Sequence, residues 1–188
     1  MSGFRGGWVY NGGACGLWRG SDVHITDKPY GNKTALTDWF KNLPKGWENP
    51  DCAFGTYVSS NCTGFIKGDQ VWVTDWDAPE LLSSYFPGMP SGWTSGIKSA
   101  WLYEGSNALG LWRGNEVHVT DKPAGNTAQI TSFFSNLPSG WENADCAYGT
   151  YGSGAVGFIK GNEVWVTDWQ MPKLLQAHWP GLPTEWAQ

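Results

Sequence analysis

An all-β fold, a four-bladed β-propeller, is what the sequence predicts, and three observations support it. A short phrase recurs four times: RGSDVHITD from Arg19, KGDQVWVTD from Lys67, RGNEVHVTD from Arg113 and KGNEVWVTD from Lys160. Each copy reads as a β-hairpin, because a glycine-led turn separates two runs that suit strands. The 26 Gly, 11 Pro and 14 Trp disfavour long helices and suit pleated strands.

The repeat has two levels, which predict how the domain is divided. Arg19 and Arg113 lie 94 positions apart in two similar halves, and Arg19 and Lys67 lie 48 positions apart within one half. A small sheet with one apolar face is not stable alone, and radial packing of four such sheets leaves only short edges exposed. We therefore predict a single propeller domain over residues 1–188, with blades at about 1–49, 50–95, 96–143 and 144–188.

The second unit shows the expected elements of one blade. Residues 51–57 (DCAFGTY) and 64–67 (GFIK) read as the first two strands, and residues 70–76 (QVWVTDW) as the third. Residues 79–93 begin with a proline, carry a short apolar run and contain Pro-Gly, which predicts one or two helical turns.

These even units resemble the hemopexin-like family, whose blades have an Asp-Ala-Ala-Phe inner strand, a Phe-Lys-Gly-Asp hairpin and a short helix ending in Trp-Pro-Gly-Leu-Pro. The resemblance covers the whole chain and implies four blades. The residues that match it are Asp51, Phe65, Lys67, Gly68, Trp72, Asp145, Phe158, Lys160, Gly161, Trp165, Trp179, Pro180, Gly181 and Pro183. The odd units depart from the pattern, since they carry His where the family has Trp. The resemblance therefore implies the fold but does not by itself transfer a function.

Composition and motifs exclude several classes of protein. A net charge of −5 argues against nucleic acid or an anionic membrane surface as the main partner. The sequence shows no run long enough to insert in a membrane and no signal peptide, so we expect a cytoplasmic or non-classically released protein. Catalytic motifs are missing too, and GSGAVG at residues 152–157 reads as a hairpin loop, so we expect no enzyme.

The four cysteines do not suggest a disulfide scaffold. Cys52 and Cys146 occupy matching apolar stretches and read as small buried side chains. Cys15 and Cys62 precede equivalent strands, and a bridge between them stays open as an alternative.

The centre of the repeated phrase alternates, with His24 and His118 in the odd units and Trp72 and Trp165 in the even ones. Polar and aromatic neighbours of the two histidines are the same in both halves, whereas other nearby positions differ. A core needs apolar volume and does not need Arg, His, Asn and Glu kept together, which favours two equivalent binding sites. The predicted site residues are Trp18, Arg19, His24, Asp27, Asn32, Trp47, Glu48 and Asn49, and in the second half Trp112, Arg113, His118, Asp121, Asn126, Trp141, Glu142 and Asn143.

A structural role for these residues is the alternative, because the duplication copied every residue of the half. Asp27 and Asp121 have counterparts in all four units, which suggests that the aspartate caps a turn. Arg19 and Arg113 likewise occupy the hairpin turn where the even units have Lys67 and Lys160.

Tryptophan with Asn, Asp, Glu, Arg and His is a suitable set for a sugar, which offers a C–H face for stacking and hydroxyls for hydrogen bonds. Repeated weak sites would add through avidity. We therefore predict a lectin that binds glycans or glycoproteins, without a cofactor, and that can also form oligomers. The alternatives that stay open are haem or polyamine binding, as in other hemopexin-like proteins, a protein-binding scaffold, and a small ion in the central channel.

Overall fold

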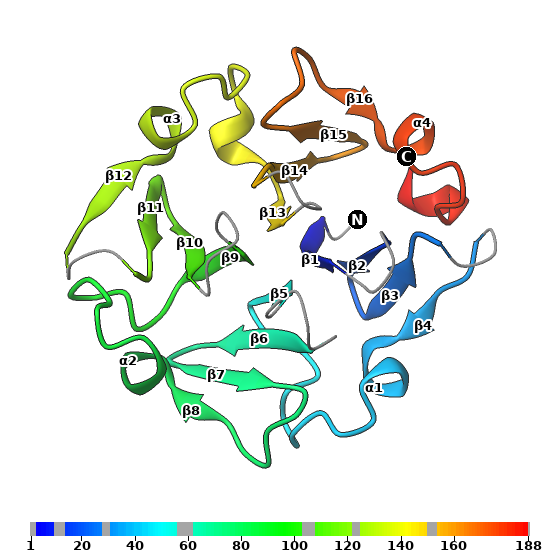
Figure 1. The fold of residues 1–188 in the computed structure, drawn as a ribbon. Helices are drawn as coiled ribbons and strands as arrows, with labels where there is room; N and C mark the ends of the chain where they lie inside the picture. Colours follow the sequence, from blue (N-terminus) through cyan, green and yellow to red (C-terminus); the bar gives the residue numbers. More distant parts are fainter. Residues whose placement is uncertain are drawn as a thin grey trace.

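Four antiparallel sheets stand in a ring in the computed structural model, which confirms the four-bladed propeller (Figure 1). The structure describes residues 3–9, 14–27, 31–55, 62–102, 108–121, 125–149 and 154–187. The blades follow the chain around the ring, so the two odd blades face each other across the axis. None of the described helices is long and apolar enough to cross a membrane.

Every blade has the same order of elements from the axis outward. The first blade has β1 (Phe4–Val9), β2 (Cys15–Arg19), β3 (Asp22–Ile25), β4 (Thr34–Ala35) and α1 (Leu36–Trp39). The second has β5 (Cys52–Gly55), β6 (Thr63–Lys67), β7 (Gln70–Val73), β8 (Glu80–Leu81) and α2 (Leu82–Tyr85). The third has β9 (Ile97–Leu102), β10 (Leu109–Arg113), β11 (Glu116–Val119), β12 (Thr127–Gln129), α3 (Ile130–Phe133) and a 3-10 turn (Trp141–Asn143). The fourth has β13 (Cys146–Gly149), β14 (Val156–Lys160), β15 (Glu163–Val166), β16 (Lys173–Leu174), α4 (Leu175–His178) and a 3-10 turn (Thr184–Trp186).

The predicted inner strand, hairpin and short helix are all present, and the structure adds an outer strand that the sequence did not indicate. In the second blade, β8 pairs with β7 through Leu81 opposite Gln70 and Glu80 opposite Val71. Two residues are too few to show the alternation by which strands are identified in a sequence. This outer strand leads directly into the helix of each blade.

A close approach of strands explains one glycine of each hairpin. The ring of Trp8 on β1 lies over Gly16 on β2, where an added Cβ would sit 2.1 Å from the ring. Phe54 over Gly64 repeats the arrangement in the second blade, at the same 2.1 Å. In each blade, an aromatic ring from the inner strand thus packs against a glycine of the second strand, where no other residue would fit.

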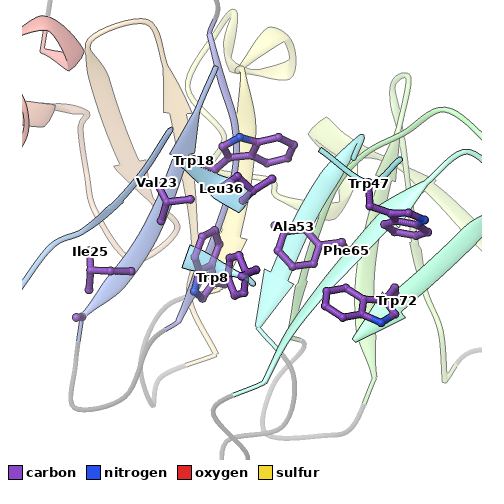
Figure 2. Close-up of a cluster of buried hydrophobic side chains, with 11 residues drawn as sticks. Trp8, Trp18, Val23, Ile25, Leu36, Trp47, Ala53, Phe65 and Trp72 are labelled. Atoms are coloured by element: carbon purple, nitrogen blue, oxygen red, sulfur yellow. The ribbon is translucent and has the colours of Figure 1, made fainter. Parts of the chain in front are cut away.

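The core lies in the four seams where neighbouring blades pack face to face. We call the seams between blades 1 and 2 and between blades 3 and 4 the within-half seams, and the other two the between-half seams. Figure 2 shows the first within-half seam, where Trp47 lies beside Trp72. Side chains alternate along the third strand, so Trp72 faces the preceding blade whereas Val71 belongs to the following seam.

The helix that covers Trp72 therefore belongs to the preceding blade, and not to its own. Leu36 of α1 lies in the same cluster as Trp72, whereas Leu82 of α2 lies in the next cluster. Each unit thus supplies a helix that seals the seam with the unit after it.

Candidate functional site

The structure separates the predicted site residues into two groups in each half. Arg19, His24 and Asn32 lie at the between-half seam, where the first blade meets the fourth. Trp47, Glu48 and Asn49 follow α1 and lie at the within-half seam with the second blade. The second half repeats this division, so the eight residues of a half do not form a single site.

Each predicted histidine is buried against the tryptophan that ends the preceding unit. His24 is 1% exposed, and its ring meets the edge of Trp186 with centroids 6.2 Å apart. His118 is equally buried against Trp93, at 6.0 Å. The position that holds Trp in even blades thus holds His in odd blades in the same packing role.

Hydrogen bonding fixes the tautomer of each neutral ring. His24 Nδ1 bonds to the Asn32 carbonyl oxygen, and His118 Nδ1 bonds to the Asn126 carbonyl oxygen at 2.7 Å. A carbonyl oxygen only accepts, so Nδ1 carries the proton in each neutral ring. The buried Nε2 of each ring has no partner among the described residues. Burial lowers the pKa of His24 below its usual 6.5, against the opposing effects of the Asn32 carbonyl and the Asp27 carboxylate.

These contacts leave little room for haem iron at either histidine. Axial ligation needs an exposed imidazole nitrogen, and each Nε2 is covered by the seam. Haem could reach His24 only after displacement of the packing around Trp186.

The predicted tryptophans belong to the core rather than to the surface. Trp18 is fully buried, and its Nε1 donates to the Gly20 carbonyl oxygen at 2.9 Å. Trp112 does the same with Gly114 at 2.8 Å. Trp141 packs against Trp165 of the next blade with ring centroids 6.5 Å apart. No ring face of this group is presented to a sugar in the folded chain.

The arginine or lysine side chain at each hairpin turn bonds to a backbone carbonyl oxygen of the preceding blade. Arg19 Nη1 donates to the Glu185 carbonyl oxygen at 3.0 Å, and Arg113 Nε donates to the Ser95 carbonyl oxygen at 2.8 Å. Lys160 Nζ reaches the Gly140 carbonyl oxygen at 2.7 Å, and Lys67 Nζ bonds to that of Gly46 in the same way. This pattern in all four blades assigns a structural role to the two arginines.

The remaining predicted residues are polar and mostly exposed. Asp27, Asn32, Glu48 and Asn49 are exposed in the first half. Asn49 Oδ1 accepts from Arg5 Nη1 at 3.3 Å, and Glu48 Oε1 accepts from the Gly46 amide at 3.2 Å. In the second half Asp121, Asn126 and Asn143 are exposed and Glu142 is half-buried.

A threonine makes the same side-chain hydrogen bond to the backbone in each unit. Thr26 Oγ1 accepts from the Cys15 amide at 2.9 Å, and Thr74 Oγ1 accepts from the Thr63 amide at 3.2 Å. Thr120 and Thr167 make the same bond to Leu109 and Val156, at 2.9 and 3.1 Å. The aspartates after them are exposed in all four blades, which leaves their carboxylates at the surface.

One mouth of the central channel carries alternating charges. Arg5 and Lys98 on inner strands, and Asp51 and Asp145 directly before inner strands, take equivalent places in the repeat and line a cavity of about 420 Å³. Asp51 Oδ2 accepts from the Gly68 amide at 2.7 Å, while Arg5 lies over the Trp18 ring at 4.6 Å. Burial lowers the pKa of Lys98, and the Asp145 carboxylate opposes this shift.

An ion on the axis would face two positive and two negative side chains at this mouth. The charges of these four side chains sum to zero, and a small ion in the central channel stays a prediction. No group of three or more His, Cys, Asp or Glu that could hold a metal occurs in the described part of the chain.

Cys15 and Cys62, both of which the structure describes, are not joined by a disulfide. Burial raises the pKa of the Cys15 thiol to about 12.

The outer rim of each within-half seam brings together residues that the sequence analysis did not single out. Asn42 Nδ2 donates to the Thr74 carbonyl oxygen at 2.5 Å, and the exposed Asp75 and half-buried Trp76 follow directly. We call this group, with the half-buried Trp39, the first rim site. The second rim site consists of Phe133, Asn136, Asp168 and Trp169.

The second rim site repeats the amide bond of the first, with a different aromatic neighbour and an additional lysine contact. Asn136 Nδ2 donates to the Thr167 carbonyl oxygen, also at 2.5 Å. Trp76 meets the edge of Tyr85, and Trp169 meets the edge of His178, each with centroids 4.8 Å apart. Lys173 Nζ lies 3.9 Å over the Trp169 ring, a contact for which the first site has no counterpart because it carries Glu80 there.

A signal for the rim sites was present in the sequence. Asn42 and Asn136 occur only in odd units, where the even units have Gly88 and Gly181. Tryptophan follows the repeated Thr-Asp only in the even units. The two observations point to one site only when the seam between the units is known.

Comparison with solved structures agrees with the fold. A plant lectin with two metal-binding sites from Cicer arietinum matches with a TM-score of 0.75 and 16% identity, covering 95% of this chain and 96% of that one. A plant albumin from Cicer arietinum showing hemagglutination matches with 0.74 and 15%, covering 95% and 96%. The hemopexin fold protein CP4 from cow pea matches with 0.71 and 13%, covering 96% of each chain. No family model and no curated protein sequence matches the chain. The chain therefore has the hemopexin fold.

Proposed function

We propose that this hemopexin-fold chain is a carbohydrate-binding protein with two equivalent sites, one at each rim site. The observation that carries the proposal is a group of three side chains that occurs twice in the ring: an exposed amide, an exposed carboxylate and a half-buried tryptophan. Asn42 bonds to the carbonyl oxygen of the threonine that precedes Asp75 and Trp76, and Asn136 makes the same bond in the second half. Binding is reversible in this proposal and involves no chemical step.

The chemistry of each rim site suits a pyranose. An indole ring offers a surface for the C–H face of the sugar, and Trp76 is the most suitable ring because part of it is exposed. The Asp75 carboxylate can accept two hydroxyl hydrogens, and the Asn42 amide can both donate and accept. The amide is also preorganised, since its bond to the Thr74 carbonyl fixes its position on the next blade.

This proposal accounts for the alternation of unlike blades. A rim site needs Asn42 from an odd blade and Trp76 from the even blade that follows it. At a between-half seam the repeat has Gly88 in the place of Asn42 and Lys122 in the place of Trp76. Neither residue has a side-chain amide or an aromatic ring. A two-blade unit, copied once, therefore yields two sites rather than four.

Two sites on opposite parts of one ring would allow the chain to crosslink glycoproteins. Weak individual contacts then gain through avidity. The likeness to a lectin and to a hemagglutinating albumin supports the proposal, although at 15–16% identity it establishes only the fold.

A glycan array probed with the full chain tests the proposal. We expect wild-type protein to bind a defined set of glycans, and the W76A/W169A variant to lose that signal while it still melts cooperatively. His24→Gln is the matched control, because this buried residue lies at the other kind of seam, and it should keep the binding pattern. Absence of glycan binding by folded wild-type protein, or full binding by W76A/W169A, would refute the proposal.

A further inference from the structure

Exposed large apolar side chains are confined to the outer edges of the even blades in the described part of the chain. Leu81 on β8 is 48% exposed, Leu174 on β16 is 55% exposed, and Met171, three residues before Leu174 in the chain, is 68% exposed. The odd blades have the half-buried Ala35 and the polar Gln129 at the position of the two leucines. Burial of such side chains against a partner is favourable, at about 25 cal/mol per Å² of apolar area.

Both leucines lie on edge strands. β8 and β16 are each the outermost strand of their sheet and are paired on one side only. The two strands lie on opposite sides of the ring (Figure 1). Strands of two residues offer few backbone hydrogen bonds, so side chains would decide what binds to these edges.

The charges of the two edges have opposite sign. Glu80 precedes Leu81, whereas Lys173 precedes Leu174, and all four side chains are exposed. The adjoining acidic Asp77 likewise corresponds to the neutral Gln170. Lys173 Nζ is held 3.9 Å over the Trp169 ring, which keeps its charge near the edge of the fourth blade.

We propose that the β8 edge of one copy of this chain binds the β16 edge of a second copy, with Glu80 opposite Lys173 and the exposed leucines packed together. Contact between two like edges would place Glu80 against Glu80, or Lys173 against Lys173, and like charges across an interface are unfavourable. The contact therefore joins unlike surfaces. Since these surfaces lie on opposite sides of the ring, successive copies form an open head-to-tail chain instead of a closed dimer.

The test is analytical ultracentrifugation of the full chain over increasing concentration. We expect the weight-average mass of wild-type protein to rise past twice the chain mass of 20.7 kDa without a plateau there. Salt should weaken the association, because part of it is a surface charge pair. A mass that stays at 20.7 kDa at every concentration would overturn the proposal, and so would a plateau at the dimer.

Charge exchange makes the test specific for the two edges. Glu80→Lys alone and Lys173→Glu alone should each weaken association by about tenfold or more, because each sets like charges against each other. An equimolar mixture of these two variants should recover chain growth, since each edge then meets an opposite charge on the other variant. The double variant E80K/K173E should recover it alone. Association of either single variant as strong as that of wild type, or a mixture that stays monomeric, would contradict the pairing.

Leu174→Asp provides an independent check on the apolar part, and unchanged association of this variant would also count against the proposal.

Discussion

The two kinds of seam differ in what they bury, although the blades on either side have the same fold. Among the described residues, six buried aromatic side chains fill the cluster of the first within-half seam and six fill that of the second. The cluster of each between-half seam has three buried aromatic side chains. There, a tryptophan such as Trp186 packs on His24 in place of another tryptophan.

The aromatic packing of the seams therefore repeats with the two-blade half and not with the single blade. The seam inside a half is packed by large rings, whereas the seams that join halves use His24 and His118. In each of these two rings one nitrogen is hydrogen-bonded and the other has no partner among the described residues. The asparagine and tryptophan of the rim sites, such as Asn42 and Trp76, also occur only at within-half seams. Packing and the proposed binding function thus follow the same period.

The largest effect should come from removing the central ring of a within-half seam. Trp72→Ala or Trp165→Ala should destabilise the fold by about 3–5 kcal/mol, because each indole is fully buried and leaves a large cavity. Urea denaturation measures the change in free energy. Trp76→Ala is the control in the same blade, since this ring is only half-buried and should cost less. Equal losses for the two variants would remove the distinction between a core ring and a rim ring.

Removal of the corresponding histidine should cost less. His24→Ala or His118→Ala leaves a carbonyl oxygen without its donor and a smaller cavity, and should cost about 1–3 kcal/mol in the same assay. His178→Ala, a change at a half-buried ring, provides the comparison. A histidine effect as large as that of Trp72→Ala would contradict the difference between the seams.

Acid should weaken the between-half seam near His24. The folded pKa of His24 lies below its usual 6.5, so the unfolded chain takes up a proton at a higher pH than the folded chain does. The contribution of His24 to stability is therefore complete above about pH 6.5 and decreases as the pH falls toward the folded pKa. Urea denaturation between pH 8 and pH 5 measures this trend. His24→Gln should flatten it, and an identical pH dependence in this variant would show that other groups control the response.

A smaller effect is expected from the amide of the rim site. Asn42→Ala removes a polar partner worth about 0.5–1.5 kcal/mol, which corresponds to roughly a twofold to tenfold loss of sugar affinity at one site. Stability should change little because the side chain is exposed. Calorimetry with a glycan identified on the array measures the affinity, and Asn32→Ala at the other seam serves as control. Equal losses in both variants would move the site away from the rim.

Much of the fold could be predicted because it depends on local patterns. The hairpins around Gly20 and Gly68, and the large inner-strand rings, are visible as repeated motifs. β8 was missed because Glu80 and Leu81 pair with only two residues of β7, and such a short strand has no period of its own.

The site was harder to predict, because residue type does not reveal burial. Trp18 and Trp47 have the chemistry of a sugar site, but they fill a seam between blades. Arg19 bonds to a backbone carbonyl of the preceding unit, a contact that depends on closure of the ring. The exposed Asp27 and Glu48 stay predicted ligand residues. Asn42 and Trp76 come from different units, so only the three-dimensional packing shows that Asn42 bonds to Thr74, two residues before Trp76.

The most direct test of the central claim, that within-half seams carry the binding sites, is the number of sugars bound per chain. Isothermal titration of wild-type protein should give two equivalent sites. Trp76→Ala or Trp169→Ala should leave one site of nearly unchanged affinity, and W76A/W169A should bind none while it remains folded. A stoichiometry of one or four in the wild type, or two sites that persist in W76A/W169A, would contradict the account.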